Sequence, residues 1–192
     1  MEIALLWDKE TPFKQYLTDM GFDCEVILPS TLSAPFFSFT GYTLAIVPAG
    51  FGNEFYSGIL LKVLRANSVL IKEFVKAGGT LFVSGALSTP DAYNWLPVNI
   101  EYVMERGRVR IAVVTVHEAA MLVEKEECVC DGYFEEAGTE GKVILTIREE
   151  RGVAKGEKAI LVAAEYGAGV IIATTIHEYP SRRFIAYCVG RR

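Results

Sequence analysis

Apolar and polar residues alternate in blocks along the first half of the chain. Short, nearly continuous apolar runs, typical of strands buried on both faces, are separated by longer segments with helical spacing and turn residues. The runs are EIALLW, CEVILP, TLAIVPAG and TLFVSG, all within residues 2–85. Strands separated by helices cannot form simple hairpins, so right-handed crossovers and a mostly parallel sheet are predicted.

The helical segments between these runs begin and end at typical residues. Thr11 is a suitable N-cap, and Pro12 fits the first turn, where its missing N–H costs nothing. The glycine at position 21 is expected to end this helix. A longer helix is predicted from about Leu60 to Ala77, before a pair of glycines. The aromatic segment SAPFFSFTG, between the second and third strands, is interpreted as a loop or a broken helix.

The second half of the chain has a different pattern, with strand-like segments that follow one another closely. They are VRIAVVTV (109–116), KVILTI (142–147), AILVAAEYG (159–167) and GVIIATTI (169–176). The turn at 167–169 fits a tight hairpin between the last two, and a terminal helix is predicted over 181–189. The predicted fold class is therefore α/β: a three-layer sandwich with a mostly parallel central sheet and an antiparallel extension in the second half.

Composition indicates one packed domain over residues 1–192. Apolar residues form 51% of the chain and charged residues 22%, which is globular composition. The net charge of −5 opposes broad nucleic-acid binding, which needs Lys and Arg to neutralise phosphates. No window has the ~18 uncharged apolar residues of a membrane span, and the N-terminus lacks the basic start of a signal peptide. A cytoplasmic location, with no nucleic-acid or membrane partner, is predicted.

The cysteines are too few and too scattered for a disulfide scaffold, so reduced thiols are expected. They are Cys24, Cys128, Cys130 and Cys188. The pair at 128 and 130 could bind a soft metal, but no second Cys or His cluster lies nearby in the sequence. Alternate residues of a strand point the same way, so two half-buried cysteines explain this pair. No metal site and no cofactor are predicted.

Three loops are expected at the carboxyl edge of the parallel sheet, where ligands gather because loops and helix N-termini supply free backbone donors. They are VPAGFGN, FVSGALS and TTIHEYPS. Their order resembles the class I glutamine amidotransferase-like superfamily, which places a glycine-rich oxyanion loop, a Cys nucleophile elbow and a His-Glu pair in that order. The resemblance runs from residue 1 to about residue 185, but an insertion over about 90–155 is atypical of the simplest members.

The first loop resembles the family's Pro-Gly-Gly turn at Pro48-Ala49-Gly50, with Ala49 in place of a glycine. The resemblance implies that backbone amides of Gly50, Phe51 and Gly52 hold a developing oxyanion, because fixed amide dipoles need no reorganisation as charge develops. Alternatively, the glycines only permit a tight turn between a strand and a helix. The aromatic side chains of this loop could also line the ligand pocket or an interface.

The second loop contains Ser84-Gly85, where LFVSGAL resembles the family strand that ends in Cys-x-Gly. A serine hydroxyl is far less acidic than a thiol and needs a well-placed base during attack. The local sequence also lacks the Gly-x-Ser-x-Gly frame of a hydrolase elbow. Ser84 is therefore either a catalytic nucleophile or a small residue that fills a sharp turn, with Gly85 beside it as a ligand-binding position.

The third loop contains His177-Glu178, which resembles the family's His-x-Glu pair except that the two residues are adjacent. Both are candidate catalytic residues, with His177 as general base, although adjacent strand residues point to opposite faces and leave Glu178 poorly placed to orient it. A capping or core-edge role for His177 is the alternative. Asp131 and Tyr133 form either a turn at a sheet edge or substrate-reading groups that the insertion brings to the pocket. A surface role is expected for His117.

Three functions remain open from the sequence. The preferred hypothesis is a glutamine amidotransferase-like protein that lacks the standard cysteine, is not a glutaminase, and binds a small molecule or a protein partner in a pocket lined by Gly50, Ser84 and His177. The second is a hydrolase of an amide, ester or sugar-derived substrate, in which Ser84 attacks and His177 accepts its proton. The third is a non-catalytic regulatory subunit that acts beside another chain or as a homo-oligomer.

Overall fold

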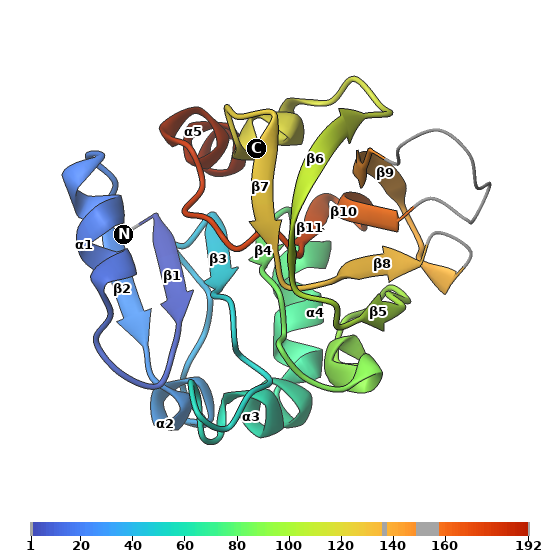
Figure 1. Cartoon of the computed structure of the whole chain (residues 1–192). Helices are drawn as coiled ribbons and strands as arrows, with labels where there is room; N and C mark the ends of the chain where they lie inside the picture. The colour runs from blue at the N-terminus through green and yellow to red at the C-terminus, as the bar shows by residue number, and fades with distance from the viewer. Residues whose placement is uncertain (1, 136–137, 149–157, 192) are drawn as a thin grey trace.

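A computed structural model describes residues 2–135, 138–148 and 158–191 and shows an α/β fold built on a mixed sheet (Figure 1). Within these residues the sheet has 11 strands, and its main path runs β2-β1-β3-β4-β11-β10-β9-β6-β7. The first five strands along this path are mutually parallel, which confirms the prediction for the first half of the chain. They are β2 (Cys24–Ile27), β1 (Ile3–Leu6), β3 (Leu44–Val47), β4 (Thr80–Val83) and β11 (Gly169–Thr174).

The remaining strands form the predicted antiparallel extension. They are β5 (Tyr102–Val103), β6 (Gly107–Val113), β7 (Glu127–Cys130), β8 (Tyr133–Glu135), β9 (Lys142–Ile147) and β10 (Lys158–Tyr166). The last strand of that prediction, at 169–176, instead joins the parallel part, because β11 pairs in parallel with β4 and antiparallel with β10. A two-residue turn, in which Gly167 has φ +62°, joins β10 to β11. The strands within the expected insertion therefore belong to the same sheet, while its residues 136–137 and 149–155 lie outside the described part of the chain.

Helix α1 (Pro12–Asp19) begins as predicted, because the Thr11 hydroxyl accepts a hydrogen bond from the Phe13 N–H at 3.3 Å. The predicted single helix over 60–77 is instead two helices, α3 (Leu60–Ala66) and α4 (Ser68–Lys76). The break lies at Asn67, whose side-chain amide donates to the Val63 carbonyl oxygen at 2.9 Å. Such local side-chain bonds compete with the regular helix ladder. The other helices and 3-10 turns are α2 (Pro29–Leu32), η1 (Pro90–Tyr93), η2 (Glu118–Leu122) and α5 (Arg182–Gly190).

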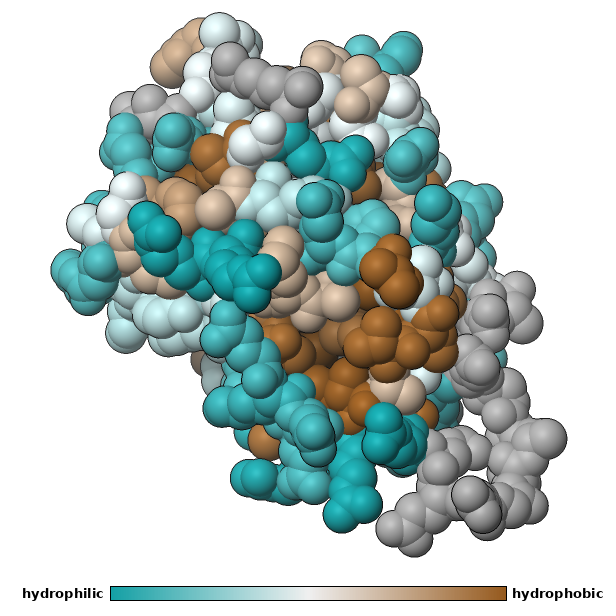
Figure 2. Space-filling view, turned by 90° about the horizontal axis from the view of Figure 1, so that it is seen from above, coloured by the Kyte–Doolittle hydropathy of each residue, from teal (hydrophilic) through white to brown (hydrophobic). Residues whose placement is uncertain are grey.

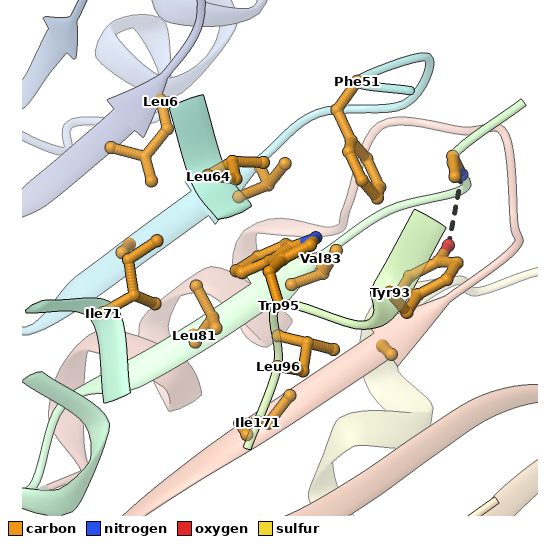
Figure 3. Packing of buried hydrophobic residues seen from close by; sticks show 14 of the residues in the cluster. Leu6, Phe51, Leu64, Ile71, Leu81, Val83, Tyr93, Trp95, Leu96 and Ile171 are labelled. Carbon is orange, nitrogen blue, oxygen red and sulfur yellow. Dashed lines mark hydrogen bonds between the residues drawn. The ribbon is translucent and has the colours of Figure 1, made fainter. Parts of the chain in front are cut away.

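Alternate residues of the parallel strands pack into two separate cores. On one face, Ile3 and Leu5 meet α1 and α5. On the other face, Ala4 and Leu6 meet α3 and α4, together with the chain that follows β4, whose Trp95 is 2% exposed (Figure 3). Helical residues thus pack on both faces of the parallel part, and loop residues such as Phe51 and Ala86 also belong to a core. No helix in the described residues is both long enough and apolar enough to span a membrane.

One part of the surface is apolar. Seen from above, apolar residues gather in a patch that is bordered in part by hydrophilic residues (Figure 2). Three valines at and beyond the end of β6, which runs towards this face in Figure 1, are exposed: Val113 by 62%, Val114 by 44% and Val116 by 99%. Contiguous apolar surface is typical of contact sites. The protein partner or homo-oligomer expected from the sequence stays a prediction.

Candidate functional site

A histidine and a buried aspartate meet beyond the carboxyl end of β11. His177 Nδ1 lies 2.7 Å from Asp131 Oδ2, and we refer to these two side chains as the His177–Asp131 pair. Asp131 is fully buried, whereas the His177 side chain is 39% exposed. Because a carboxylate only accepts hydrogen bonds, the imidazole places its N–H on Nδ1 and leaves Nε2 as the free nitrogen.

Backbone hydrogen bonds between two distant segments place this pair. Cys130, the last residue of β7, forms an isolated antiparallel bridge with Ile176. The amide of the following residue, Asp131, donates to the Thr175 carbonyl oxygen, and the His177 amide donates to the Val129 carbonyl oxygen, each at 2.7 Å. These hydrogen bonds therefore fix the backbone positions of Asp131 and His177 at the rim.

Gly85, just beyond β4, is the residue that faces the pair. A Cβ atom at position 85 would lie 2.8 Å from Asp131 Oδ2 and 2.9 Å from Asp131 Cβ, so any other residue would displace the carboxylate. The Tyr102 hydroxyl donates to the Asp131 carbonyl oxygen at 3.0 Å and holds the same residue from another side. The carboxyl ends of the parallel strands β4 and β11 thus meet the end of β7, a strand of the antiparallel extension.

Ser84 is not at a sharp turn, which corrects the interpretation from the sequence. Its amide donates to the Val47 carbonyl oxygen at 2.9 Å, so the chain continues the pairing of β4 with β3 past the strand end. Its carbonyl oxygen accepts the Tyr93 hydroxyl at 2.9 Å. Among described non-glycine residues, only Leu87 has a positive φ, +52°. Since neighbours in an extended segment point to opposite sides, the Ser84 side chain is directed away from the side on which Gly85 meets Asp131.

The hydroxyl of Ser84 is almost buried, since the residue is 8% exposed, and it has no hydrogen-bond partner among the described residues. In particular, it is not hydrogen bonded to the imidazole of His177. The structure therefore brings Gly85, Asp131 and His177 together, and it leaves the Ser84 hydroxyl out of the hydrogen-bonded pair.

The amides of Gly50 and Gly52 are not free oxyanion donors, contrary to the implication of the resemblance. The Gly50 amide donates to the Gly85 carbonyl oxygen at 2.7 Å, and the Gly52 amide donates to the Ala86 carbonyl oxygen at 3.1 Å. Gly50 has φ +86°, a conformation that favours glycine. These glycines therefore hold the loop after β3 against the chain that follows β4.

Phe51 does not line a pocket through its side chain. It is fully buried and packs edge-on against Tyr93 and Trp95, with ring centroids 5.4 and 6.1 Å apart (Figure 3). The Tyr93 hydroxyl also accepts the Ala86 amide at 3.1 Å. These aromatic side chains therefore pack in the core beside the rim and stabilise the fold there.

The remaining predicted residues lie around the pair. The carboxylate of Glu178 forms an ion pair with Lys125 at 3.1 Å, whereas the hydrogen bond to the imidazole of His177 comes from Asp131. Tyr133 is on β8, and the ammonium of Lys158 lies over its ring, 4.4 Å from the centroid. His117 caps η2, because its Nδ1 accepts the Ala119 amide at 3.1 Å. Sequence reasoning named both members of the pair but did not connect them, because no local pattern links positions 46 residues apart.

The pair changes the acid–base chemistry of the histidine. The hydrogen bond with Asp131 raises the pKa of His177 above its ordinary value, and the negative charge of Asp131 acts in the same direction. Partial burial and the positive charge of Arg106 oppose this rise. Asp131 Oδ1 is buried and has no hydrogen-bond partner in the part of the chain that the structure describes. The protonated imidazole can donate a hydrogen bond from Nε2, and the neutral imidazole can accept a proton there.

No group of three or more potential metal-binding His, Cys, Asp or Glu side chains occurs in the described ranges. Cys128 and Cys130 are buried, not half-buried as expected, and their sulfur atoms lie 3.5 Å apart. A cavity of about 840 Å³ lies at the other rim, among residues that precede strands, such as Thr43, Gly79 and Ala168. This cavity therefore lies at the amino ends of the strands, whereas the His177–Asp131 pair lies at the carboxyl ends.

None of the known protein-family models matches the chain, and no curated protein matches its sequence. Solved structures share its fold. A putative GMP synthase component from Thermoplasma acidophilum superposes with a TM-score of 0.64 at 11% identity, covering 99% of this chain and 93% of that chain. A cytoplasmic protein from Salmonella typhimurium has a TM-score of 0.61 at 16% identity, covering 98% of each chain.

A β-galactosidase from Bacillus circulans sp. alkalophilus has a TM-score of 0.57 at 10% identity over 99% of this chain. This chain spans only 30% of the length of that enzyme. The fold therefore occurs both in proteins of about this size and as part of a much longer chain. At such low identities, the likeness establishes a shared fold and no activity.

Proposed function

We propose that this chain is a glutamine amidotransferase-like domain, a three-layer α/β sandwich, that lacks a nucleophile and binds a small molecule at the His177–Asp131 pair. One observation carries the proposal: a glycine, Gly85, and not a thiol or hydroxyl, faces the buried carboxylate at the end of β4. Two of the three amides predicted as oxyanion donors, those of Gly50 and Gly52, are also paired with backbone carbonyls. A cytoplasmic location belongs to the same proposal, since one structural neighbour is described as a cytoplasmic protein.

The chemistry of this site is that of an oriented imidazole. Asp131 fixes the ring through Nδ1, so Nε2 presents one hydrogen-bonding position to a ligand. The position is a donor when the ring is protonated and an acceptor when it is neutral. A buried carboxylate behind the ring also keeps the orientation constant between the two states, which favours recognition of one polar group on a ligand.

The direct test of this proposal is release of ammonia from glutamine by the purified chain. We expect none above the level of the His177→Gln variant, which removes the free ring nitrogen and keeps a polar side chain. A glutamine-dependent rate that Ser84→Ala abolishes would show that a hydroxyl nucleophile operates and would refute the proposal. A Lys125→Gln variant, altered next to the site but outside the pair, serves as the control for surface changes.

The second candidate is a hydrolase, and the His177–Asp131 hydrogen bond favours it. A buried carboxylate that orients an imidazole is the arrangement that activates serine or water in hydrolases. In the described structure the Ser84 hydroxyl is not bonded to the imidazole, so this function requires the hydroxyl to reach Nε2 when substrate binds. A serine-directed phosphonate probe tests it: an adduct on Ser84 that His177→Gln prevents would favour the hydrolase over the binding protein.

A further inference from the structure

Cys128 and Cys130 form a pair of buried thiols on β7 that the proposed function does not use. Both are free cysteines, and their sulfur atoms lie 3.5 Å apart. They are only 2% and 1% exposed. Because they are two residues apart on one strand, both side chains point to the same face, into the apolar core that also contains Ala119, Leu122 and Ile176. The chain thus holds two soft donor atoms side by side in apolar surroundings.

Backbone pairing fixes the distance between the two cysteines. In the antiparallel ladder with β6, Cys128 lies opposite Val109 and Cys130 lies opposite Gly107, and Cys130 also forms a bridge with Ile176. Residues i and i+2 of a strand are about 6.6 Å apart, which is twice the rise per residue. Their Cβ atoms have a similar separation, whereas the Cβ atoms of a disulfide lie about 3.5 to 4.5 Å apart. A disulfide between these two thiols would therefore require β7 to bend away from its partners.

A metal ion between the two sulfur atoms fits the same spacing. A bond from a thiolate to a metal is about 2.3 Å long, so a linear sulfur–metal–sulfur unit spans about 4.6 Å. From their present separation of 3.5 Å, the sulfur atoms must move apart by about 1 Å. Rotation about the side-chain bonds provides this movement, because the Cβ atoms are already further apart than the span of the unit. The pairing of β7 with its neighbours is then kept.

The donor set selects the metal. Among the residues that the structure describes, no third His, Cys, Asp or Glu side chain joins the two cysteines to form a metal-binding group. Structural Zn²⁺ takes four protein ligands, iron–sulfur clusters are held by four, and Cu²⁺ prefers a square arrangement of nitrogen and oxygen ligands. Copper(I) is a soft ion that thiolates select, and two sulfur ligands in a line satisfy it.

We propose that Cys128 and Cys130 bind one copper(I) ion between their sulfur atoms. As the ion binds, both S–H protons leave to solvent, so two thiolates and one monovalent cation form a unit with one negative charge. No electron is transferred, because the copper enters and stays as copper(I). This site goes beyond the proposed function and does not depend on it, since neither ligand belongs to the His177–Asp131 pair.

The ion reaches the sulfur atoms at an edge of the sheet. β7 is the last strand on the main path of the sheet, and residues of the short 3-10 turn η2 share its core. Local opening of an edge element costs less free energy than global unfolding. Because both thiols are almost fully buried, copper is expected to bind slowly and to be released slowly.

The experiment is an anaerobic titration of the reduced full chain with copper(I), in competition with the coloured copper(I) chelator bicinchoninate. We expect the wild-type chain to take one equivalent of copper from the chelator. Cys128→Ala and Cys130→Ala should each weaken binding by more than about 100-fold, because loss of even an outer-shell group costs about 10- to 100-fold. Cys188→Ala is the matched control. Its thiol is free and fully buried in the same core but lies outside the pair, so this variant should stay within about twofold of the wild type.

X-ray absorption at the copper edge needs only the wild-type chain, so it decides the question even where a variant fails to fold. Two sulfur neighbours without nitrogen or oxygen neighbours support the proposal, and three or more neighbours overturn it. A wild-type chain that takes no copper from the chelator, or a Cys188→Ala variant that loses as much binding as the pair variants, also overturns it. So does a disulfide between Cys128 and Cys130 that forms in air in the folded chain, seen by mass spectrometry as the loss of two hydrogen atoms, because β7 would then bend freely.

Discussion

The substitution Gly85→Ala tests the geometry on which the candidate site depends. The new methyl group would lie 2.8 Å from Asp131 Oδ2, 2.9 Å from Asp131 Cβ and 3.3 Å from Asp131 Cγ. Non-bonded carbon atoms prefer about 3.5 to 4.0 Å. The backbone at position 85 does not have a positive φ, so alanine itself fits the chain and the strain falls on Asp131.

The size of the effect follows from these distances. To restore normal contacts, the Asp131 side chain must move by about 0.6 Å or more. A displacement of this size, starting from 2.7 Å, weakens or breaks the bond to His177 Nδ1. Overpacking of a buried site costs about 1 to 3 kcal/mol. For a chain of this length, the melting temperature should fall by about 2 to 12 °C.

Two measurements follow the substitution. Thermal or denaturant unfolding gives the loss of stability, and NMR titration gives the pKa of His177, which should fall towards or below its ordinary value once the carboxylate has moved. Gly107→Ala is the matched control. Gly107 lies in β6 near the same site, and a Cβ there meets no atom within 4 Å, so both quantities should stay close to wild type.

The result that contradicts this reasoning is a folded Gly85→Ala protein with an unchanged His177 titration and wild-type stability. It would mean that Gly85 does not lie against the carboxylate. The central argument, that glycine occupies the place of a nucleophile next to the pair, would then lose its structural basis.

Three further substitutions separate the roles of the surrounding residues. Asp131→Asn should lower the pKa of His177. Because folding raises this pKa in the wild-type protein, protonation of His177 stabilises the fold fully below about pH 6.5, and this stabilisation is lost as the pH rises through the pKa of the folded state. The free energy of unfolding, measured against pH, should therefore decrease less over this range in the variant than in the wild type. Glu178→Gln should leave the His177 titration nearly unchanged by NMR and cost no more than about 1 kcal/mol in denaturant unfolding, because it breaks only a surface ion pair with Lys125. Phe51→Ala should cost about 3 to 5 kcal/mol in the same unfolding assay, since its ring is fully buried; a stable variant with altered ligand binding would instead support a pocket role.

The sequence by itself determined the α/β class, the parallel first half and the antiparallel strands of the second half, but it did not place the last strand, β11, beside β4 in the parallel part. These features depend on residues that are close together in the sequence. They are the apolar runs that fit buried strands, Thr11 at a helix start, and a short glycine turn between β10 and β11. It also indicated which loops share the carboxyl rim. At Asn67, where a side-chain hydrogen bond competes with the helical backbone pattern, the periodicity predicted one continuous helix and the structure has two.

Only the tertiary structure decided which residues act together. Asp131 and His177 meet because the chain after β7 and the chain after β11 pair through their backbones, a contact between segments with no shared sequence pattern. The same long-range pairing directs Gly85, not Ser84, at the carboxylate and uses the amides of Gly50 and Gly52 within the fold. Side-chain direction at a strand end and the use of backbone donors depend on which segments lie alongside, and periodicity along one segment carries no information about them.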